Sequence, residues 1–259
     1  MPPRLLVSTA AFFGRPLAET CRLVADAGYD AIEVMVTKDP ASQDPGQMKI
    51  IAASFGLEIG AIHAPALLIT RRVWGTDPIG KIGTAIEVAD AVGAPLVVMH
   101  PPYRWQRSYR EWLRADLPGI EDRTGMTVAI ENMFPVHVGS RPLMLHADQD
   151  LDGLDDIAHL VLDTSHAAVA RHDLVEVRRR FAERLRHVHL SDNAGKGWDS
   201  HLPPGEGVLP LAAFAADLAA SGFGGAVTLE VDLRGRGDDP TSLHAILVSM
   251  REQVEAWLR

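Results

Sequence analysis

The sequence predicts a single (β/α)₈ barrel over residues 1–259, and three observations carry this prediction. Short apolar runs rich in Val, Ile and Leu recur eight times along the chain. They are hydrophobic throughout, as expected of parallel strands that are covered on both faces. Segments with helical spacing separate them, and many of these segments end in a glycine that turns the chain into the next run. Such alternation, without a linker or a low-complexity break, is typical of one α/β barrel.

The expected strands lie at 5–8, 31–36, 57–63, 96–100, 127–131, 160–163, 188–190 and 227–231. The expected helices lie at 16–27, 43–55, 77–93, 105–117, 172–184, 210–221 and 241–258, with a shorter one near 148–158. In the clearest helix, Asp77 can cap the N-terminus, Pro78 occupies the first turn and Gly93 ends the helix. An open doubly wound sheet is the alternative, but no G-x-G-x-x-G motif follows the first run, so no nucleotide cofactor is expected.

Composition limits the location and the partners of the protein. The chain has 259 residues, of which 47% are hydrophobic, and a formal net charge of -9. Its single cysteine, Cys21, cannot form an internal disulfide, so a reducing, cytoplasmic compartment is expected. No apolar run approaches the roughly 18 residues of a membrane span, and the first residues lack a signal-peptide cleavage pattern. The acidic balance opposes nucleic acid as a partner, although it is compatible with a local basic cleft.

Six consecutive apolar runs end in a histidine or a carboxylate. These terminal residues are His63, His100, Glu131, Asp163, His189 and Glu230. The carboxyl ends of barrel strands converge around one axis, where barrel enzymes build their active sites. Converging carboxylates repel one another unless a cation lies among them or some are protonated. The economical interpretation is a divalent metal ion.

The loop within 186–207 follows the strand that carries His189 and contains Asp199, His201 and four glycines. We expect the chemistry there, because glycine-rich backbone approaches a small molecule closely. Glu33 is read as the end of the second strand, either facing the same mouth or buried as a structural carboxylate. Surface positions are expected for the six remaining histidines, at positions 137, 146, 159, 172, 187 and 244.

Four motifs resemble those of the xylose isomerase-like barrels, a family that groups sugar isomerases and epimerases with endonuclease IV. They are IENM at Glu131, LDTSHA at Asp163 and His166, VHLSDN at His189, and TLEV at Glu230. The resemblance implies a divalent metal ion held by Glu131, Asp163, His189 and Glu230. Three carboxylates and one imidazole suit Mn²⁺, Mg²⁺, Co²⁺ or Zn²⁺, and ligand type does not choose among them.

Endonuclease IV-like members bind three zinc ions through additional residues. Their pattern is met at His63, His100, His166, Asp199 and His201, which are therefore expected as further metal ligands. Isomerase-like relatives also carry a D-x-H followed by LPPGEG, so this set does not decide between the two activities. We expect one tightly held ion and a weaker second one. His63 and His100 are alternatively plain hydrogen-bonded pocket residues.

The resemblance first implies a metal-dependent isomerase or epimerase acting on a small keto sugar, sugar phosphate or sugar-like acid. In it, Glu131 and Glu230 are the catalytic acid/base pair that removes and returns a proton. The expected substrate-binding residues are His63, His100, His166, Lys196 and Arg71. Lys196 or Arg71 is the expected contact of a phosphate or carboxylate, if the substrate has one. The segments 63–75 and 101–112 mix arginines with aromatic residues, and they form a sugar pocket wall, a base-stacking surface or packed helix starts. A small-molecule sugar is the expected partner, and a homo-oligomer is one expected assembly.

The second implied activity is that of an endonuclease IV-like zinc phosphodiesterase that cleaves abasic DNA. The nine-position match favours it. The acidic balance opposes it, and so does Ala66, which stands where the endonuclease motif has an aromatic residue that enters the DNA. Lyase or dehydratase chemistry and a non-catalytic binding barrel are also open.

Overall fold

Eight parallel strands close into one barrel in the computed structural model, which describes residues 2–66, 70–138, 141–236 and 239–259. In their order around the barrel these strands are β1 (Arg4–Ser8), β10 (Ala226–Leu229), β9 (Leu185–Leu190), β8 (Leu160–Asp163), β5 (Thr127–Glu131), β4 (Leu96–Met99), β3 (Glu58–His63) and β2 (Ala31–Met35). The predicted (β/α)₈ fold is confirmed, and each of the eight apolar runs forms one barrel strand.

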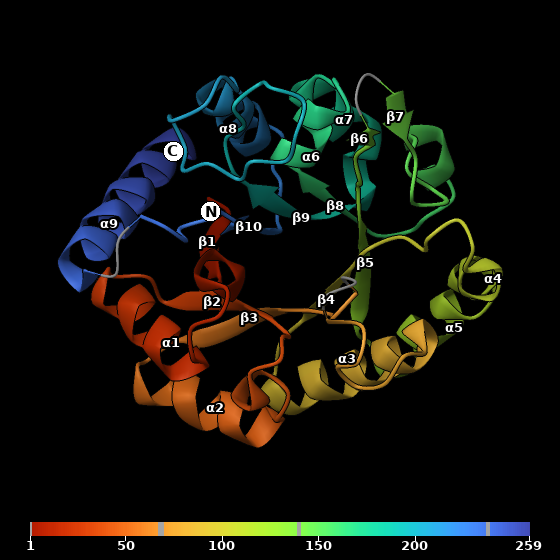
Figure 1. Ribbon diagram of the computed structural model, residues 1–259, viewed down its shortest axis with the longest axis horizontal. Coiled ribbons are helices and arrows are strands. Elements are labelled where there is room, and N and C mark those ends of the chain that lie inside the picture. The colour runs from red at the N-terminus through yellow and green to blue at the C-terminus, as the bar shows by residue number, and fades with distance from the viewer. Residues whose placement is uncertain (1, 67–69, 139–140, 237–238) are drawn as a thin grey trace.

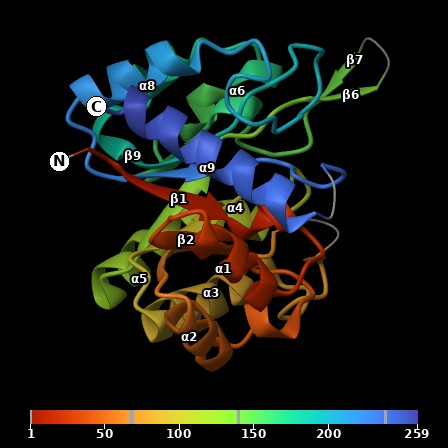
Figure 2. The ribbon, with the colours of Figure 1, turned by 90° about the vertical axis from the view of Figure 1, so that its left-hand side faces the viewer.

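A ring of helices surrounds the barrel (Figure 1). They are α1 (Leu17–Asp26), α2 (Pro45–Ser54), α3 (Pro78–Val92), α4 (Arg107–Ala115), α5 (Leu117–Thr124), α6 (Thr164–Val169), α7 (Leu174–Phe181), α8 (Leu211–Ala220) and α9 (Pro240–Trp257). Short 3₁₀ turns are η1 (Thr9–Phe12), η2 (Pro40–Ser42), η4 (Leu151–Leu154) and η5 (Ala182–Arg184). Both chain ends lie at one end of the barrel, and the hairpin β6 (Val136–Val138) to β7 (Arg141–Leu143) lies at the other (Figure 2).

The helix predicted at residues 77–93 forms as α3, and Asp77 and Gly93 cap its two ends as expected. The Asp77 side chain accepts a hydrogen bond from the backbone N–H of Gly80, which satisfies one free donor of the first turn of α3. Gly93 follows the helix with φ of 77°, a left-handed conformation that glycine adopts without steric cost.

The helix expected near 148–158 is wrong, because only the 3₁₀ turn η4 forms there. Gly153 lies in its middle, and aspartates with low helix propensity surround it. Two of these aspartates are held by arginines instead, with Asp148 paired to Arg110 at 2.8 Å and Asp152 paired to Arg180 at 2.6 Å. The helix expected at 105–117 is shorter than predicted, and a second helix, α5, follows it.

Two layers of side chains fill the barrel near its carboxyl end. A small apolar cluster of Leu96, Ala61, Val98, Ala129 and Val161 is separate from the main core between the strands and the helices. Side chains alternate along a strand, so the residue two positions further on points the same way. The polar residues that follow Ala61, Val98, Ala129 and Val161 at this spacing are His63, His100, Glu131 and Asp163. On these four strands, the polar layer therefore lies directly above apolar side chains.

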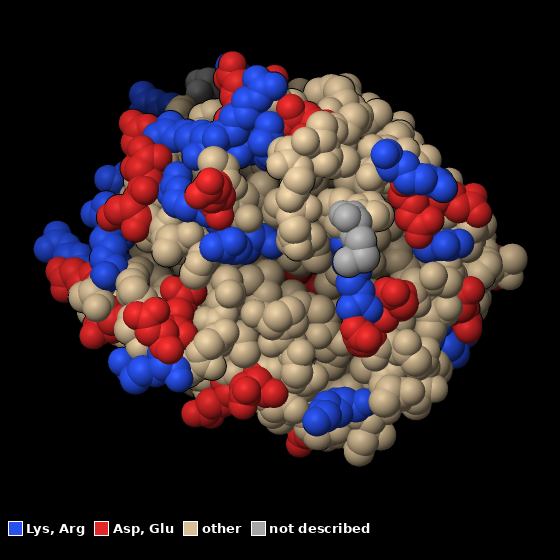
Figure 3. All heavy atoms as spheres, turned by 180° about the vertical axis from the view of Figure 1, so that it is seen from behind, with Lys and Arg blue, Asp and Glu red and all other residues tan. Residues whose placement is uncertain are grey.

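Two surface properties bear on the partners of the protein. Among the described helices, none combines the length and the hydropathy that crossing a bilayer requires. Figure 3 shows the face opposite to that of Figure 1, and acidic and basic side chains are interspersed around its edge. Among the described residues, basic groups on this face thus have acidic neighbours, whereas a long polyanion favours a patch of basic side chains alone.

Candidate active site

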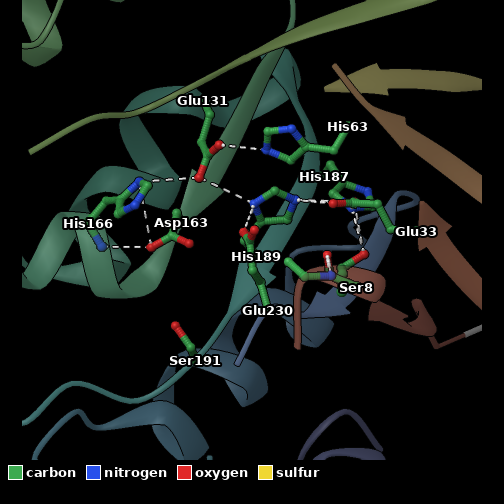
Figure 4. A network of polar contacts seen from close by, with 12 residues as sticks. Ser8, Glu33, His63, Glu131, Asp163, His166, His187, His189, Ser191 and Glu230 are labelled. Atoms are coloured by element: carbon green, nitrogen blue, oxygen red, sulfur yellow. Dashed lines mark hydrogen bonds and ion pairs between the residues drawn. The ribbon is translucent and has the colours of Figure 1, made fainter. Parts of the chain in front are cut away.

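Four buried residues form the centre of the site. Glu131 ends β5, Asp163 ends β8, His189 lies near the end of β9, and Glu230 follows β10. Each offers a ligand atom, and these atoms lie within 4.8 Å of one another. Nδ1 of His189 is 2.6 Å from a Glu230 oxygen and 3.3 Å from a Glu131 oxygen (Figure 4). The structure thus brings together the four residues expected to hold a metal ion.

The remaining five expected ligands flank this centre on two sides. On one side, the Nε2 atoms of His63 and His100 lie 3.4 and 3.2 Å from the Glu131 carboxylate. On the other side, Asp163 groups with His166 and His201. Three adjoining groups of possible ligands, with Asp199, form a continuous cluster of nine residues, which comprises His63, His100, Glu131, Asp163, His166, His189, Asp199, His201 and Glu230. A fourth group among the described residues joins His63 and His189 to Glu33.

The LDTSHA motif builds one side of the cluster through a helix cap. The Asp163 side chain accepts a hydrogen bond of 2.6 Å from the backbone N–H of His166 at the first turn of α6. This cap uses one carboxylate oxygen and leaves the other oxygen, Oδ2, buried without a hydrogen-bond partner among the described residues. The Asp199 carboxylate lies 3.5 Å from Nε2 of His166 and 2.8 Å from Nε2 of His201.

Asp192 shapes the loop that carries Asp199 and His201. Its carboxylate accepts hydrogen bonds from the backbone N–H groups of Gly205 and Leu209, each at 3.0 Å. A Cβ at Gly207 would lie 2.2 Å from an Asp192 oxygen, so only glycine fits there. The glycines of this loop thus allow the chain to fold back tightly and to present His201 at the cluster.

The electrostatics of the cluster couple its carboxylates to its imidazoles. Burial raises the pKa of Asp163 to about 6. Burial alone would also raise the pKa of Glu131, but the imidazoles of His189 and His166 outweigh it and hold that pKa well below its ordinary value. Burial opposes the charge on His201, yet Asp199 and Asp163 raise its pKa to about 10. Protons and a divalent cation therefore compete for the same atoms.

The donor atoms fit a divalent cation. Among the described residues, Oδ2 of Asp163 is buried and has no hydrogen-bond partner, and Oε2 of Glu131 has only longer contacts, of 3.2 and 3.4 Å, with the imidazoles of His100 and His63. Buried polar atoms normally have a partner, so the Asp163 oxygen calls for a group that the protein does not supply. Carboxylate and imidazole donors suit Mn²⁺, Mg²⁺, Co²⁺ or Zn²⁺.

Glu33 lies beneath the centre. It was expected to end the second strand, but it lies fully buried in the middle of β2, because pairing with β3 continues to Met35. Its carboxylate lies 3.1 Å from Nε2 of His189 and 2.9 Å from Nε2 of His187 (Figure 4). Glu33 is thus both a buried carboxylate and a direct contact of the site.

The surface expectation is wrong for His187 and His146. His187 lies two positions before His189 on β9, so it also points into the barrel, where it is 1% exposed. His146 is buried because its Nδ1 hydrogen-bonds to the Pro101 carbonyl at 2.7 Å. His172 and His159 are half-buried and His244 is exposed. The side chain of His137 lies outside the described part of the structure.

Replacing Glu33 by Gln is expected to weaken metal affinity by roughly 10- to 100-fold. The Glu33 carboxylate faces Nε2 of His189 and so orients the Nδ1 atom toward Glu131 and Glu230; outer partners of this kind tune metal sites to that extent. A zinc titration against a chromophoric chelator measures the affinity. Glu58→Gln is the control, because Glu58 is exposed and pairs with Arg4 at the start of its strand. Equal zinc affinity in Glu33→Gln and wild type would exclude this role.

The two expected anion-binding residues lie in different places. Arg71 lines a cavity that opens beside His100 and is also lined by Tyr103 and Trp105. Lys196 is exposed on the loop after β9, with its ammonium nitrogen 5.7 Å from the centre of the Trp198 ring. Within the described residues, Lys196 belongs neither to that cavity nor to the nine-residue cluster.

The fold is an α/β barrel, and its cluster of carboxylates and imidazoles lies at the carboxyl ends of the strands, where barrels of this class build their active sites. The model of the family described as "Xylose isomerase-like TIM barrel" matches residues 21–252. The chain belongs to this family.

Two protein relatives extend the comparison. The "Uncharacterized protein Rv0498" of Mycobacterium tuberculosis is 38% identical over 246 residues, which cover 87% of each chain. A Streptomyces coelicolor protein with the name "Putative hydroxypyruvate isomerase" is 35% identical over 199 residues, covering 74% of this chain and 59% of its own.

Solved structures share the fold at low sequence identity. A D-tagatose 3-epimerase-like protein has a TM-score of 0.71 and 21% identity, and the match covers 98% of both chains. An AP endonuclease of family 2 from Brucella melitensis has a TM-score of 0.67 and 18% identity, covering 93% of this chain and 96% of that one. Sugar epimerases and AP endonucleases are thus both structural neighbours of the chain.

Proposed function

We propose that the protein is a divalent-metal-dependent isomerase or epimerase of a small keto sugar or sugar derivative. The observation that carries the proposal is the approach of two buried glutamates, from different strands, to one nitrogen of His189. Glu131 ends β5 and Glu230 follows β10; β8 and β9 separate these two strands in the barrel, yet both carboxylates contact Nδ1 of His189. Carboxylates placed in this way can reach a substrate on the barrel axis from two directions.

Each glutamate has a defined task in this proposal. One takes the proton from the carbon next to the substrate carbonyl, and the other returns a proton on the opposite face or at the neighbouring carbon. A bound divalent ion polarises the carbonyl and so makes that C–H more acidic. His166, on the far side of Asp163, and His63, beside Glu131, are placed to hydrogen-bond substrate oxygens. The name of the Streptomyces coelicolor relative supports this class of reaction.

The test is solvent exchange by the metal-loaded protein. Keto sugars, their phosphates and short keto acids are incubated with it in deuterium oxide and followed by nuclear magnetic resonance. We expect one of them to take up deuterium at the carbon next to the carbonyl and to form its isomer or epimer. Absence of exchange across the panel, with metal occupancy verified, would contradict the proposal.

A metal-dependent phosphodiesterase is the second candidate, and the nine-residue cluster favours it. Three adjoining groups of ligands, with Glu131 and Asp163 each belonging to two of them, are suited to more than one ion. Neighbouring ions can stabilise both the attacking and the leaving oxygen of a phosphodiester. The net charge of -9 opposes DNA as the substrate.

We expect no measurable binding to an abasic DNA duplex at physiological salt. A duplex binder must neutralise several phosphates, and its affinity then falls steeply as salt rises. Fluorescence anisotropy of a labelled abasic duplex, with an intact duplex as control, measures this. Nanomolar binding that weakens sharply with salt, followed by strand incision, would favour the phosphodiesterase over the isomerase.

The cellular setting is also a proposal. Cys21 is buried with a free thiol, and burial raises its pKa to about 12. A thiol of this kind is inert and compatible with a reducing, cytoplasmic compartment.

A further inference from the structure

A cavity of about 320 Å³ adjoins the nine-residue cluster and shares His100 with it. Its walls come from the segment after β3, the first turn of α3 and the segment after β4. The cavity is therefore an extension of the candidate active site toward α3, and a group bound in it would lie beside the reacting centre.

The charge of this cavity is opposite to that of the chain as a whole. The described lining residues include Arg71 and Lys81 but no aspartate or glutamate, although the chain holds 34 acidic and 25 basic residues. Within the described part of the chain, neither cation has a carboxylate within ion-pairing distance. The wall thus carries positive charge that the surrounding protein does not neutralise.

Lys81 is the more unusual of the two cations. It is 7% exposed, and its ammonium donates hydrogen bonds to the carbonyl oxygens of Pro65 at 2.8 Å and Thr70 at 3.0 Å. Burial lowers the pKa of Lys81. A buried charge is costly unless it is paired, and carbonyl oxygens pair it only in part. An anion bound in the cavity would pair with the ammonium of Lys81.

Two stacked aromatic residues also line the cavity. Tyr103 and Trp105 stack with ring centres 4.7 Å apart and an angle of 4° between their planes. Tyr103 also stacks on His146 at 4.4 Å, which fixes the ring against a buried residue. The stacked rings thus form a rigid part of the cavity wall.

We propose that this cavity is the binding site for the anionic group of the substrate, held by Lys81 and Arg71. The substrate class is then a small keto sugar derivative that carries a phosphate or a carboxylate. The proposal rests on the proposed function, because His100 joins the cavity to the cluster that contains Glu131 and thus directs the reacting carbons toward that cluster. Lys196, the other expected anion contact, is not among the described residues that line this cavity.

Binding of small probes to the metal-loaded protein tests the proposal without turnover. Isothermal titration compares glycerol 3-phosphate, glycerate and glycerol, which share a carbon skeleton and differ in the charged group. We expect one of the two anions to bind and neutral glycerol not to bind. The anion with the higher affinity identifies the group as phosphate or carboxylate.

Variants locate the bound anion. Arg71→Gln and Lys81→Met should each weaken anion binding by roughly 10- to 100-fold, since each removes a charge-assisted hydrogen bond. Arg72→Gln is the matched control, because Arg72 is exposed and does not line the cavity. Lys81→Met also removes the contacts to Pro65 and Thr70, so Arg71→Gln, which leaves them in place, must show the same direction of change.

The outcomes separate this inference from the proposed function. Anion affinity that is unchanged in both variants, or glycerol binding equal to that of the anions, would overturn the inference. Selective anion binding that both variants weaken would support it even if no sugar showed deuterium exchange. In that case the proposed isomerase activity alone would fail.

Discussion

Replacing Glu131 or Glu230 by Gln should lower the turnover of the keto substrate by about 10² to 10⁴. The amide keeps the shape of the side chain and an oxygen ligand but cannot accept the proton. The two residues approach Nδ1 of His189 from different strands, so neither can easily take over the task of the other within one bound orientation. Steady-state rates and deuterium incorporation at the reacting carbon measure the loss.

Metal loss is the confounding effect in this experiment, because an amide is a weaker ligand than a carboxylate. Occupancy is therefore measured in each variant and restored with excess metal before the assay. Glu87→Gln, on the exposed side of α3, is the control and should keep wild-type turnover. Full activity in metal-filled Glu131→Gln or Glu230→Gln would remove that residue from the mechanism.

Removing the bound cation with a chelator should abolish turnover and lower the melting temperature by about 5–10 °C. A ligand at about 100 times its dissociation constant stabilises a protein by about 2.7 kcal/mol, and 1 kcal/mol shifts the melting temperature of a chain of this size by about 2–4 °C. In the cluster, buried atoms such as Oδ2 of Asp163 have no hydrogen-bond partner among the described residues, so the loss of a cation is not compensated. Differential scanning calorimetry before and after dialysis measures the shift.

Restoring the metal is the control for chelation and should recover both the melting temperature and the turnover. A chelator effect that persists after metal is restored would indicate irreversible damage to the fold. Full activity of protein verified as metal-free would contradict metal dependence.

The fold and six residues of the nine-residue cluster could be predicted from the pattern of apolar runs, whereas His166, Asp199 and His201 lie on α6 or the loop after β9 and were expected only from the family resemblance. Continuous apolar runs fix the strands, and the carboxyl ends of parallel barrel strands must converge. Residues such as His63 and Asp163 therefore belong to one cluster although 100 positions separate them. That inference needs only parallel strands, which the alternation of apolar runs with helical segments predicts.

Features that depend on packing were harder to predict. Glu33 and His187 meet beneath His189 because of their depth in the barrel, which strand boundaries do not give. The alternation in HVH, with His187 two positions before His189, was the signal that could have placed His187 inside. Lys81 reaches its cavity from the first turn of a helix, and no motif marks that position. The helix expected near 148–158 failed because arginines from other elements hold the aspartates there.

Elemental analysis of the protein purified without added metal is the most direct test of the central claim, a divalent cation at Glu131, Asp163, His189 and Glu230. The account predicts one tightly held divalent ion per wild-type chain, with a weaker second, and loss of the tight ion in folded His189→Ala. Three zinc ions per chain would instead favour the phosphodiesterase. Wild-type protein that retains no ion even after reconstitution, or His189→Ala that retains as much as wild type, would contradict the account.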